Sequence, residues 1–170
     1  MGFALAEACA ERGAEVTLVA GPVSLKTHHP AIKRIDVESA GEMYQAAMTA
    51  FPSSDAAILC AAVADYRPEN ASEQKIKRET EREMTLHLVP NPDIAASLGA
   101  IKREGQVMVG FALETNDEAT HAEGKLKRKN LDFIVLNSLR DQGAGFRCDT
   151  NKITIIDNAG GVTSYPLKTK

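Results

Sequence analysis

Segments with a helical pattern alternate with short apolar runs along almost the whole chain. An alanine-rich stretch over residues 1–12 predicts a helix that ends at Gly13, and residues 15–19 then indicate a short buried strand. Further strands are predicted over 33–37, 55–63, 84–89, 107–112 and 131–136, and further helices over 39–51, 91–102 and 116–129. Such alternation predicts a Rossmann-like α/β fold, in which a mostly parallel sheet carries helices on both faces.

Three segments add detail to this prediction. Residues 55–63 (DAAILCAAV) are nearly all apolar, which is typical of a central strand covered on both faces. The tail segments 152–157 and 162–166 flank an Asn-Ala-Gly-Gly turn, so a C-terminal β-hairpin is predicted at an antiparallel edge. Residues 64–83 are polar and charged, and we expect a flexible active-site loop there.

The chain opens directly on its predicted helix, whereas a Rossmann-like chain begins with a strand and a glycine-rich phosphate loop. A missing first strand leaves unpaired backbone groups in the sheet, which is costly. We therefore expect an N-terminally truncated domain, or another chain or segment that fills the place of that strand.

Bulk properties narrow the class of protein. A length of 170 residues suits one domain over 1–170. The net charge of −3 argues against nonspecific nucleic-acid binding, and no apolar run is long enough to span a bilayer. The N-terminus lacks the pattern of a signal peptide, and the three cysteines lack metal-ligand spacing. These features predict a protein of the reducing cytoplasm.

Four segments lie where ligands bind in open α/β sheets, at or beyond the carboxyl ends of strands. Residues 61–67 hold small residues that let a ligand approach, although a packed strand end with Asp65 and Arg67 paired on the surface explains them as well. Residues 75–78 (KIKR) suit a triphosphate or a developing oxyanion, although the acidic residues nearby also fit a solvated charge run.

The other two segments involve helix ends. In residues 90–93 (PNPD), Asn91 as N-cap and Pro92 at the first helical position predict a helix start, which either binds an anion or is simply capped. Lys125 and Lys129 are spaced i, i+4, so both can reach one phosphate chain. The simpler interpretation is favourable charge at a helix C-terminus.

Other chemistries find little support. The four histidines lack a third ligand at useful spacing, so structural or solvated roles fit them best. The sequence contains no GxSxG, HExxH or Walker A pattern, and an acyl-enzyme or zinc mechanism is therefore not indicated.

An ordered set of motifs runs through essentially the whole chain and resembles the phosphopantothenoylcysteine synthetase family, the synthetase half of the bifunctional bacterial coenzyme A protein. The motifs are GFALAEACAERGAEVTLVAGPVSL, CAAVADYRPEN, KIKR, NPDI, VGFALET, KRKNLD and GFRCDTNKI. The other half of that protein, a flavin-dependent decarboxylase, is not represented in this chain.

The resemblance implies a ligase of coenzyme A biosynthesis that joins 4′-phosphopantothenate to L-cysteine with CTP and Mg²⁺. The pantothenate carboxylate attacks the α-phosphate and releases pyrophosphate. The cysteine amine then attacks the acyl-cytidylate and releases CMP. It also implies a homodimer, and a decarboxylase domain that is fused to the synthetase or is its partner.

The resemblance further implies roles for particular residues. Lys75 is the implied catalytic residue, in contact with the acyl-cytidylate and its phosphate. The implied nucleotide-binding positions are Cys60, Ala61, Asp65, Lys75, Pro90, Asn91, Pro92, Asp93, Phe111, Lys125 and Lys129. The implied substrate-binding positions are Ala62, Lys77, Arg78 and Asn137. Phe111 also fits a role in core packing.

The sequence departs from the family pattern in two places. Arg78 replaces the last lysine of a KxKK segment, which keeps the charge but changes the donor geometry. Pro90 stands where a lysine is common, which puts one phosphate contact in doubt. In addition, the family's glycine-rich loop and an asparagine used in forming the acyl-cytidylate lie upstream of Met1.

Two rival functions stay open. A nicotinamide-dependent oxidoreductase uses the same type of sheet but needs a GxGxxG loop after its first strand, and this sequence has none. A noncatalytic or incomplete nucleotide-binding module also fits a truncated domain.

Overall fold

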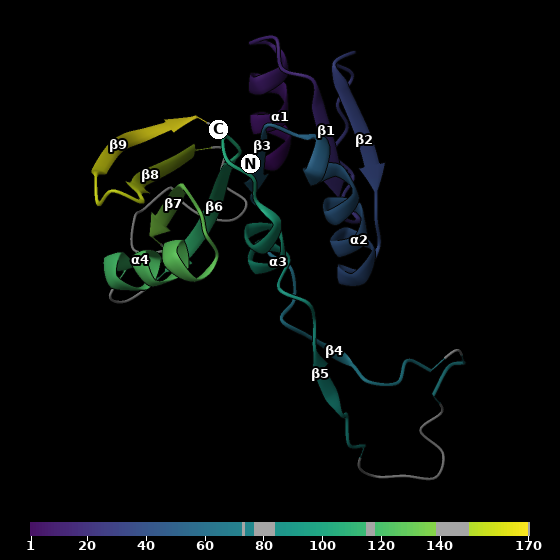
Figure 1. The fold of residues 1–170 in the computed structure, drawn as a ribbon. Helices are drawn as coiled ribbons and strands as arrows, with labels where there is room; N and C mark the ends of the chain where they lie inside the picture. The colour runs from purple at the N-terminus through teal and green to yellow at the C-terminus, as the bar shows by residue number, and fades with distance from the viewer. Residues whose placement is uncertain (73, 77–83, 115–117, 139–149, 170) are drawn as a thin grey trace.

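The computed structural model describes residues 1–72, 74–76, 84–114, 118–138 and 150–169. Helices and strands alternate through most of the chain and end in an antiparallel hairpin (Figure 1). The predicted α/β class is confirmed, with a mixed sheet rather than a wholly parallel one. No helix within the described ranges is long and apolar enough to cross a membrane.

The N-terminal elements form a small unit of their own. Its elements are α1 (Gly2–Ala10), β1 (Val16–Ala20), β2 (Ile32–Asp36) and α2 (Ala40–Ala50). β1 and β2 pair in parallel, and α1 and α2 both pack against β1. Gly13 takes a φ of +92°, which confirms the predicted helix end. The Ser39 hydroxyl accepts the Glu42 N–H at 3.1 Å, which confirms the predicted cap.

A five-stranded sheet forms the larger part of the body. Its order is β3-β6-β7-β8-β9, with β3, β6 and β7 parallel and the last two strands antiparallel. The strands are β3 (Ala56–Leu59), β6 (Val107–Glu114), β7 (Phe133–Ser138), β8 (Thr150–Asp157) and β9 (Val162–Thr169). The predicted hairpin is therefore confirmed. Its turn is closed by the Asp157 carboxylate, which accepts the N–H groups of Ala159 and Gly161.

The prediction that residues 55–63 form a central strand covered on both faces is wrong for the described structure. β3 ends at Leu59 and, among the strands that the structure describes, pairs with β6 alone, so it lies at the edge of its sheet. Ile58 is 42% exposed as a result. An apolar run indicates burial, but the order of the strands decides which strand receives neighbours on both sides. The first described element is α1, so the expectation of a preceding strand stays a prediction.

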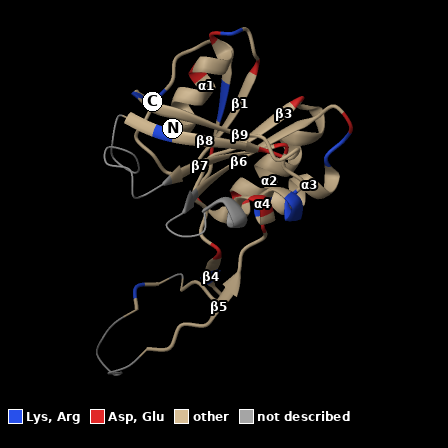
Figure 2. Ribbon diagram, turned by 90° about the vertical axis from the view of Figure 1, so that its left-hand side faces the viewer, with Lys and Arg blue, Asp and Glu red and all other residues tan. Residues whose placement is uncertain are grey.

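The segment expected to be a loop, residues 64–83, contains a strand. β4 (Tyr66–Pro68) pairs antiparallel with β5 (Leu88–Pro90), and the predicted strand over 84–89 is correspondingly shorter than expected. β4 and β5 extend away from the body in both views (Figures 1 and 2). We call the described residues of this segment, 64–72, 74–76 and 84–91, the arm.

Two helices flank the remaining strands. α3 (Ile94–Ile101) packs against α2, and α4 (Glu118–Arg128) packs against β6, β7 and β8. The predicted cap at Asn91 is wrong, because Asp93 caps α3 through a bond from the Ala96 N–H to its carboxylate at 3.0 Å. Asn91 instead uses its side chain to bind the start of the arm. The predicted start of the other helix, Asn116, lies outside the described residues.

The core lies between the five-stranded sheet and these helices. Leu98, Met108 and Ile134 are its largest fully buried side chains. Gln106, a buried polar residue, donates to the Phe51 and Ser54 carbonyls at 3.0 and 2.6 Å. Its Oε1 accepts the Arg103 N–H at 2.8 Å, so each polar atom of the amide has a partner, which offsets the cost of burial. Phe51 begins the 3₁₀ turn η1 (Phe51–Ser53), where Pro52 ends the preceding helix as predicted.

The Asp132 carboxylate ties four parts of the body together. One oxygen accepts both Lys102 Nζ at 2.6 Å and the Met108 N–H at 2.7 Å. The Asp132 N–H in turn donates to the Met108 carbonyl, and its own carbonyl accepts the Asn158 N–H of the hairpin turn. Partial burial raises the pKa of Asp132, but the bonds from Lys102 and Met108 outweigh it and hold that pKa below its usual value.

Asp132→Asn tests this junction. The asparagine leaves Lys102 without its counter-ion, so we expect the free energy of unfolding at pH 7 to fall by about 2 kcal/mol. Because the folded-state pKa is depressed, the stabilisation by Asp132 is complete above about pH 4 and is lost as the pH falls through the folded-state value. Urea unfolding of both proteins between pH 7 and pH 3 should therefore show the difference shrinking.

Asp36→Asn is the matched control, because the Asp36 side chain is 69% exposed in its ion pair with Arg34. A surface pair contributes about 0–1 kcal/mol, so this variant should stay close to the unaltered protein. An Asp132→Asn effect that is equally small, or that is independent of pH, would contradict the proposed role of the junction.

Candidate functional site

The end of β3 begins the candidate site. Cys60 directly follows the strand and is half-buried, while Ala61, Ala62 and Asp65 are exposed. Burial raises the pKa of the Cys60 thiol, although the N-terminal charge and a backbone hydrogen bond with Gly2 oppose that rise. The thiol is thus neutral near pH 7. The exposed small residues leave the backbone at this strand end accessible.

The base of the arm is held by backbone and side-chain hydrogen bonds between its two ends. The Asn91 N–H donates to the Asp65 carbonyl at 2.7 Å, and Asn91 Nδ2 donates to the Ala64 carbonyl at 2.9 Å. Arg67 Nη1 donates to the Pro90 carbonyl at 2.8 Å and to Asn91 Oδ1 at 3.2 Å. We call this group of residues the arm clasp: Ala64, Asp65, Arg67, Pro90 and Asn91.

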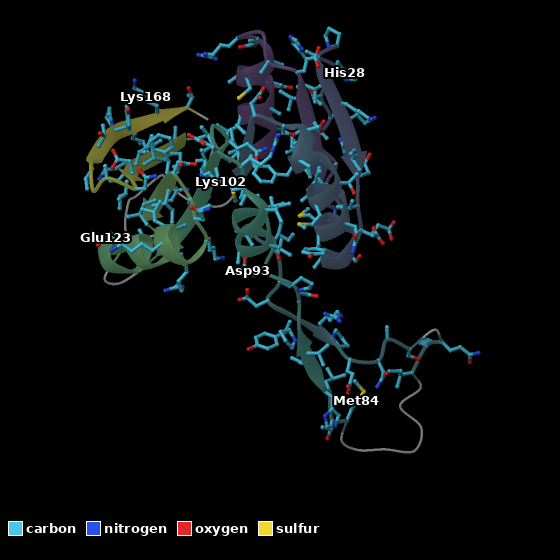
Figure 3. All side chains as sticks on the ribbon, viewed as in Figure 1. His28, Met84, Asp93, Lys102, Glu123 and Lys168 are labelled. Atoms are coloured by element: carbon cyan, nitrogen blue, oxygen red, sulfur yellow. The ribbon has the colours of Figure 1, made fainter. Side chains whose placement is uncertain are left out.

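Only Pro92 separates the arm clasp from Asp93, the N-cap residue of α3 (Figure 3). Asp93 caps the helix through one oxygen, and its other oxygen accepts Lys129 Nζ at 3.0 Å. Burial raises the pKa of Asp93, but the Ala96 N–H and Lys129 together outweigh it and lower that pKa. The carboxylate is therefore ionised at neutral pH and holds the Lys129 ammonium beside the helix end.

A glycine allows this approach of Lys129. A Cβ atom at Gly99 would overlap the Lys129 carbonyl, so a larger residue there would push α3 away from the end of α4. The Asn130 side chain donates to the Gly99 carbonyl at 3.0 Å and closes the same contact. Lys125 lies one turn before Lys129 on the basic last turn of α4, as the i, i+4 spacing predicts.

The structure brings Asn91, Pro92, Asp93 and Lys129 together, with Asp65 joined to them through the arm clasp. Lys75 lies on the arm beyond β4, where it is exposed, and no hydrogen bond or ion pair joins it to another described residue. Lys77 and Arg78 lie outside the described residues.

Two further predicted site residues, Phe111 and Asn137, contact neighbouring strands of the five-stranded sheet. Phe111 lies within β6 opposite Val135 of β7 and is partly buried, in keeping with its alternative role in packing. Asn137 lies near the end of β7, and its Oδ1 accepts Asn151 Nδ2 at 3.2 Å. Asn151 is buried, and its own Oδ1 has no hydrogen-bond partner among the described residues.

Three contributors were missed or misjudged by sequence reasoning. The surface pairing suggested for Asp65 and Arg67 is wrong, because Arg67 binds the opposite end of the arm instead. Gly99 and Asn151 carried no signal in the sequence, since each depends on a contact between distant segments. A Gly within a helical pattern indicates close packing only once the neighbouring helix is known.

The described residues contain no group of three or more histidine, cysteine or acidic side chains placed to hold a metal ion. This arrangement does not fit a metal site made by protein ligands alone. In many enzymes Mg²⁺ is instead bound by substrate phosphates together with one or two carboxylates. The chain itself supplies cations, a helix N-terminus and exposed backbone, which suit a phosphate-bearing ligand.

Several known proteins and one family model are similar to this chain in sequence. The family model described as "DNA/pantothenate metabolism flavoprotein C-terminal domain" matches residues 1–170. A protein named "Cysteine/Cysteine sulfinic acid decarboxylase", from an unknown prokaryotic organism, is 57% identical over the whole chain, which covers 47% of its length. The "Coenzyme A biosynthesis bifunctional protein CoaBC" of Vibrio parahaemolyticus serotype O3:K6 is 51% identical over 91% of the chain and 39% of its own length.

A solved structure is also similar. The "C-terminal Domain of Coenzyme A biosynthesis bifunctional protein CoaBC" superposes with a TM-score of 0.80 and 33% identity, over 99% of this chain and 73% of that one. The chain thus spans less than half of the length of the two curated relatives. The resemblance found in the sequence is confirmed: the chain belongs to the DNA/pantothenate metabolism flavoprotein C-terminal domain family, which includes the C-terminal domain of CoaBC.

Proposed function

We propose that this chain is the synthetase domain of a phosphopantothenate–cysteine ligase in coenzyme A biosynthesis, and that it uses CTP. The observation that carries the proposal is the convergence of Asp93, Lys129 and the base of the Lys75-bearing arm at the N-terminus of α3. Family membership supports the same substrate class, because similar proteins carry coenzyme A biosynthesis in their names.

The proposed reaction has two steps. The carboxylate of 4′-phosphopantothenate attacks the α-phosphorus of CTP, forming an acyl-cytidylate as the bond to pyrophosphate breaks. The amine of L-cysteine then attacks the acyl carbon, so an amide forms and CMP leaves with the electrons of the broken C–O bond. The amine loses a proton to solvent or to a base.

Electrostatics supports these assignments. Phosphopantothenate and CTP are both polyanions and repel one another, so cations are needed where they meet. In the proposal, Lys129 and Lys125 contact the triphosphate, which arrives as its magnesium complex. Lys75 contacts the acyl-cytidylate and its phosphate. Cys60, Ala61 and Asp65 contribute to the nucleotide site, and Ala62 and Asn137 to the substrate site.

The proposal also includes a homodimer, a cytoplasmic location and a decarboxylase domain that is fused to this one or associates with it. The greater length of the curated relatives supports a further domain in those proteins, and one of them is named a decarboxylase. Cys9 and Cys60 are free thiols, in keeping with a reducing compartment.

The full-length protein provides the direct test. With CTP, Mg²⁺, 4′-phosphopantothenate and L-cysteine, we expect equal amounts of pyrophosphate, CMP and 4′-phosphopantothenoylcysteine, measured by coupled assay and mass spectrometry. Omitting cysteine should allow the acyl-cytidylate to accumulate. Thermal stabilisation by NADH but not by CTP, together with an absence of product, would favour an oxidoreductase instead. CTP binding without product would favour a noncatalytic module.

Lys75→Gln tests the catalytic assignment. We expect CTP affinity to change little, because the triphosphate contacts lie on α4, while kcat falls at least about tenfold as a charge that stabilises the transition state is lost. Lys168→Gln is the control, since Lys168 lies on β9, far from Asp93 in Figure 3. Unchanged turnover in Lys75→Gln would remove Lys75 from the mechanism.

Lys129→Met tests the phosphate contact. Loss of one charge-assisted hydrogen bond costs roughly 1.5 kcal/mol, so the KM for CTP should rise about tenfold. Lys127→Met on the same helix is the matched control, because Lys127 is exposed and two positions away from the face shared by Lys125 and Lys129. If both variants raise KM equally, the effect is one of general charge and the specific contact is wrong.

A further inference from the structure

Arg67 is a cation that bonds the opposite end of the arm. It lies on β4, next to the candidate site, yet its Nη1 is bonded to the Pro90 carbonyl and Asn91 Oδ1. Both acceptors lie at the other end of the arm, more than twenty positions along the chain. The guanidinium thus joins the two ends of the arm where they leave and re-enter the body.

The strands of the arm are poorly suited to hold it by themselves. β4 and β5 have three residues each, and each contains a proline that lacks an N–H donor. An isolated two-stranded hairpin is marginally stable in water. The direction of the arm therefore depends on bonds outside the strand ladder, and those bonds are made by Arg67 and Asn91.

Arg67 also fixes the orientation of Asn91. Because Asn91 Oδ1 faces the guanidinium, Nδ2 is directed to the Ala64 carbonyl on the opposite end of the arm. Each polar atom of that side chain is used at the clasp. Removing the guanidinium leaves the amide without the charged donor that sets its orientation.

The clasp connects stiffly to the phosphate-facing helix end. Pro90 and Pro92 lie on either side of Asn91, and a proline fixes its own φ and restricts the residue before it. The next residue, Asp93, caps α3 and binds Lys129. The arm base and the Lys129 contact are thus separated by a short, conformationally restricted stretch.

We infer that Arg67 is a positioning residue: through Asn91 it fixes the direction of the arm relative to α3, and thereby the position from which Lys75 acts on the intermediate. This inference rests on the proposed function. Arg67 acts through Lys75 and touches neither substrate, and its loss affects turnover rather than nucleotide affinity.

The test is a double-mutant cycle in the full-length protein with Arg67→Met, Lys75→Gln and the combined variant. We expect Arg67→Met to lower kcat about tenfold by misplacing Lys75, with the KM for CTP changed less than about twofold. In the Lys75→Gln background, Arg67→Met should lower kcat no further, because the group that it positions is already gone.

Arg103→Met is the matched control. Arg103 also donates to a proline carbonyl, that of Pro52 at 2.7 Å, but it lies in the body, away from the arm. It should leave kcat and KM unchanged. A multiplicative loss in the combined Arg67/Lys75 variant, or a raised KM with unchanged kcat, would overturn the inference, because either result means that Arg67 acts independently of Lys75.

Amide hydrogen exchange provides a readout that does not need turnover. The Asn91 and Glu69 N–H groups donate to the Asp65 and His87 carbonyls across the arm base, so they should be protected in the unaltered protein and exchange faster in Arg67→Met. Unchanged exchange would overturn the clasp itself. A lack of product from the unaltered protein, by contrast, would count against the ligase proposal.

Discussion

The Asp132 carboxylate is the contact on which the arrangement of the body depends. It binds the lysine at the end of α3, the start of β6 and, through its own backbone, the turn of the hairpin. An ionised group with several donors around it is costly to leave incomplete, so these segments are held to one relative position. α3 is thereby fixed at its C-terminal end, and its N-terminal end meets α4 through Asp93 and Lys129.

The arm follows a different principle from the body. The body is held by a buried apolar core, whereas the arm exposes large apolar side chains, among them Tyr66, Leu86 and Leu88. Its attachment is polar and local, concentrated in a few hydrogen bonds at its base. The position of the arm therefore depends on a few directional bonds, whereas the body is held by the burial of many apolar side chains.

Sequence patterns predicted features that depend on neighbouring residues and failed where distant segments compete. The Ser39 cap, the Gly13 helix end and the hairpin turn were predicted correctly, because each is decided within a few residues. Asn91 was wrongly assigned as a helix cap because Arg67 and Ala64, far away in the sequence, bind its side chain. The ion pair of Lys129 with Asp93 could not be predicted, since it needs the packing of α3 on α4.

Gly99 has a consequence for how proteins of this kind diverge. Any side chain at this position overlaps the Lys129 carbonyl unless α4 retreats, and a retreat would draw the lysine away from Asp93. The residues at 99 and 129 are therefore coupled through the Lys129 backbone and not through its side chain. In a lineage that replaces the glycine, we expect compensating changes at the end of α4, so the two positions would vary together during evolution.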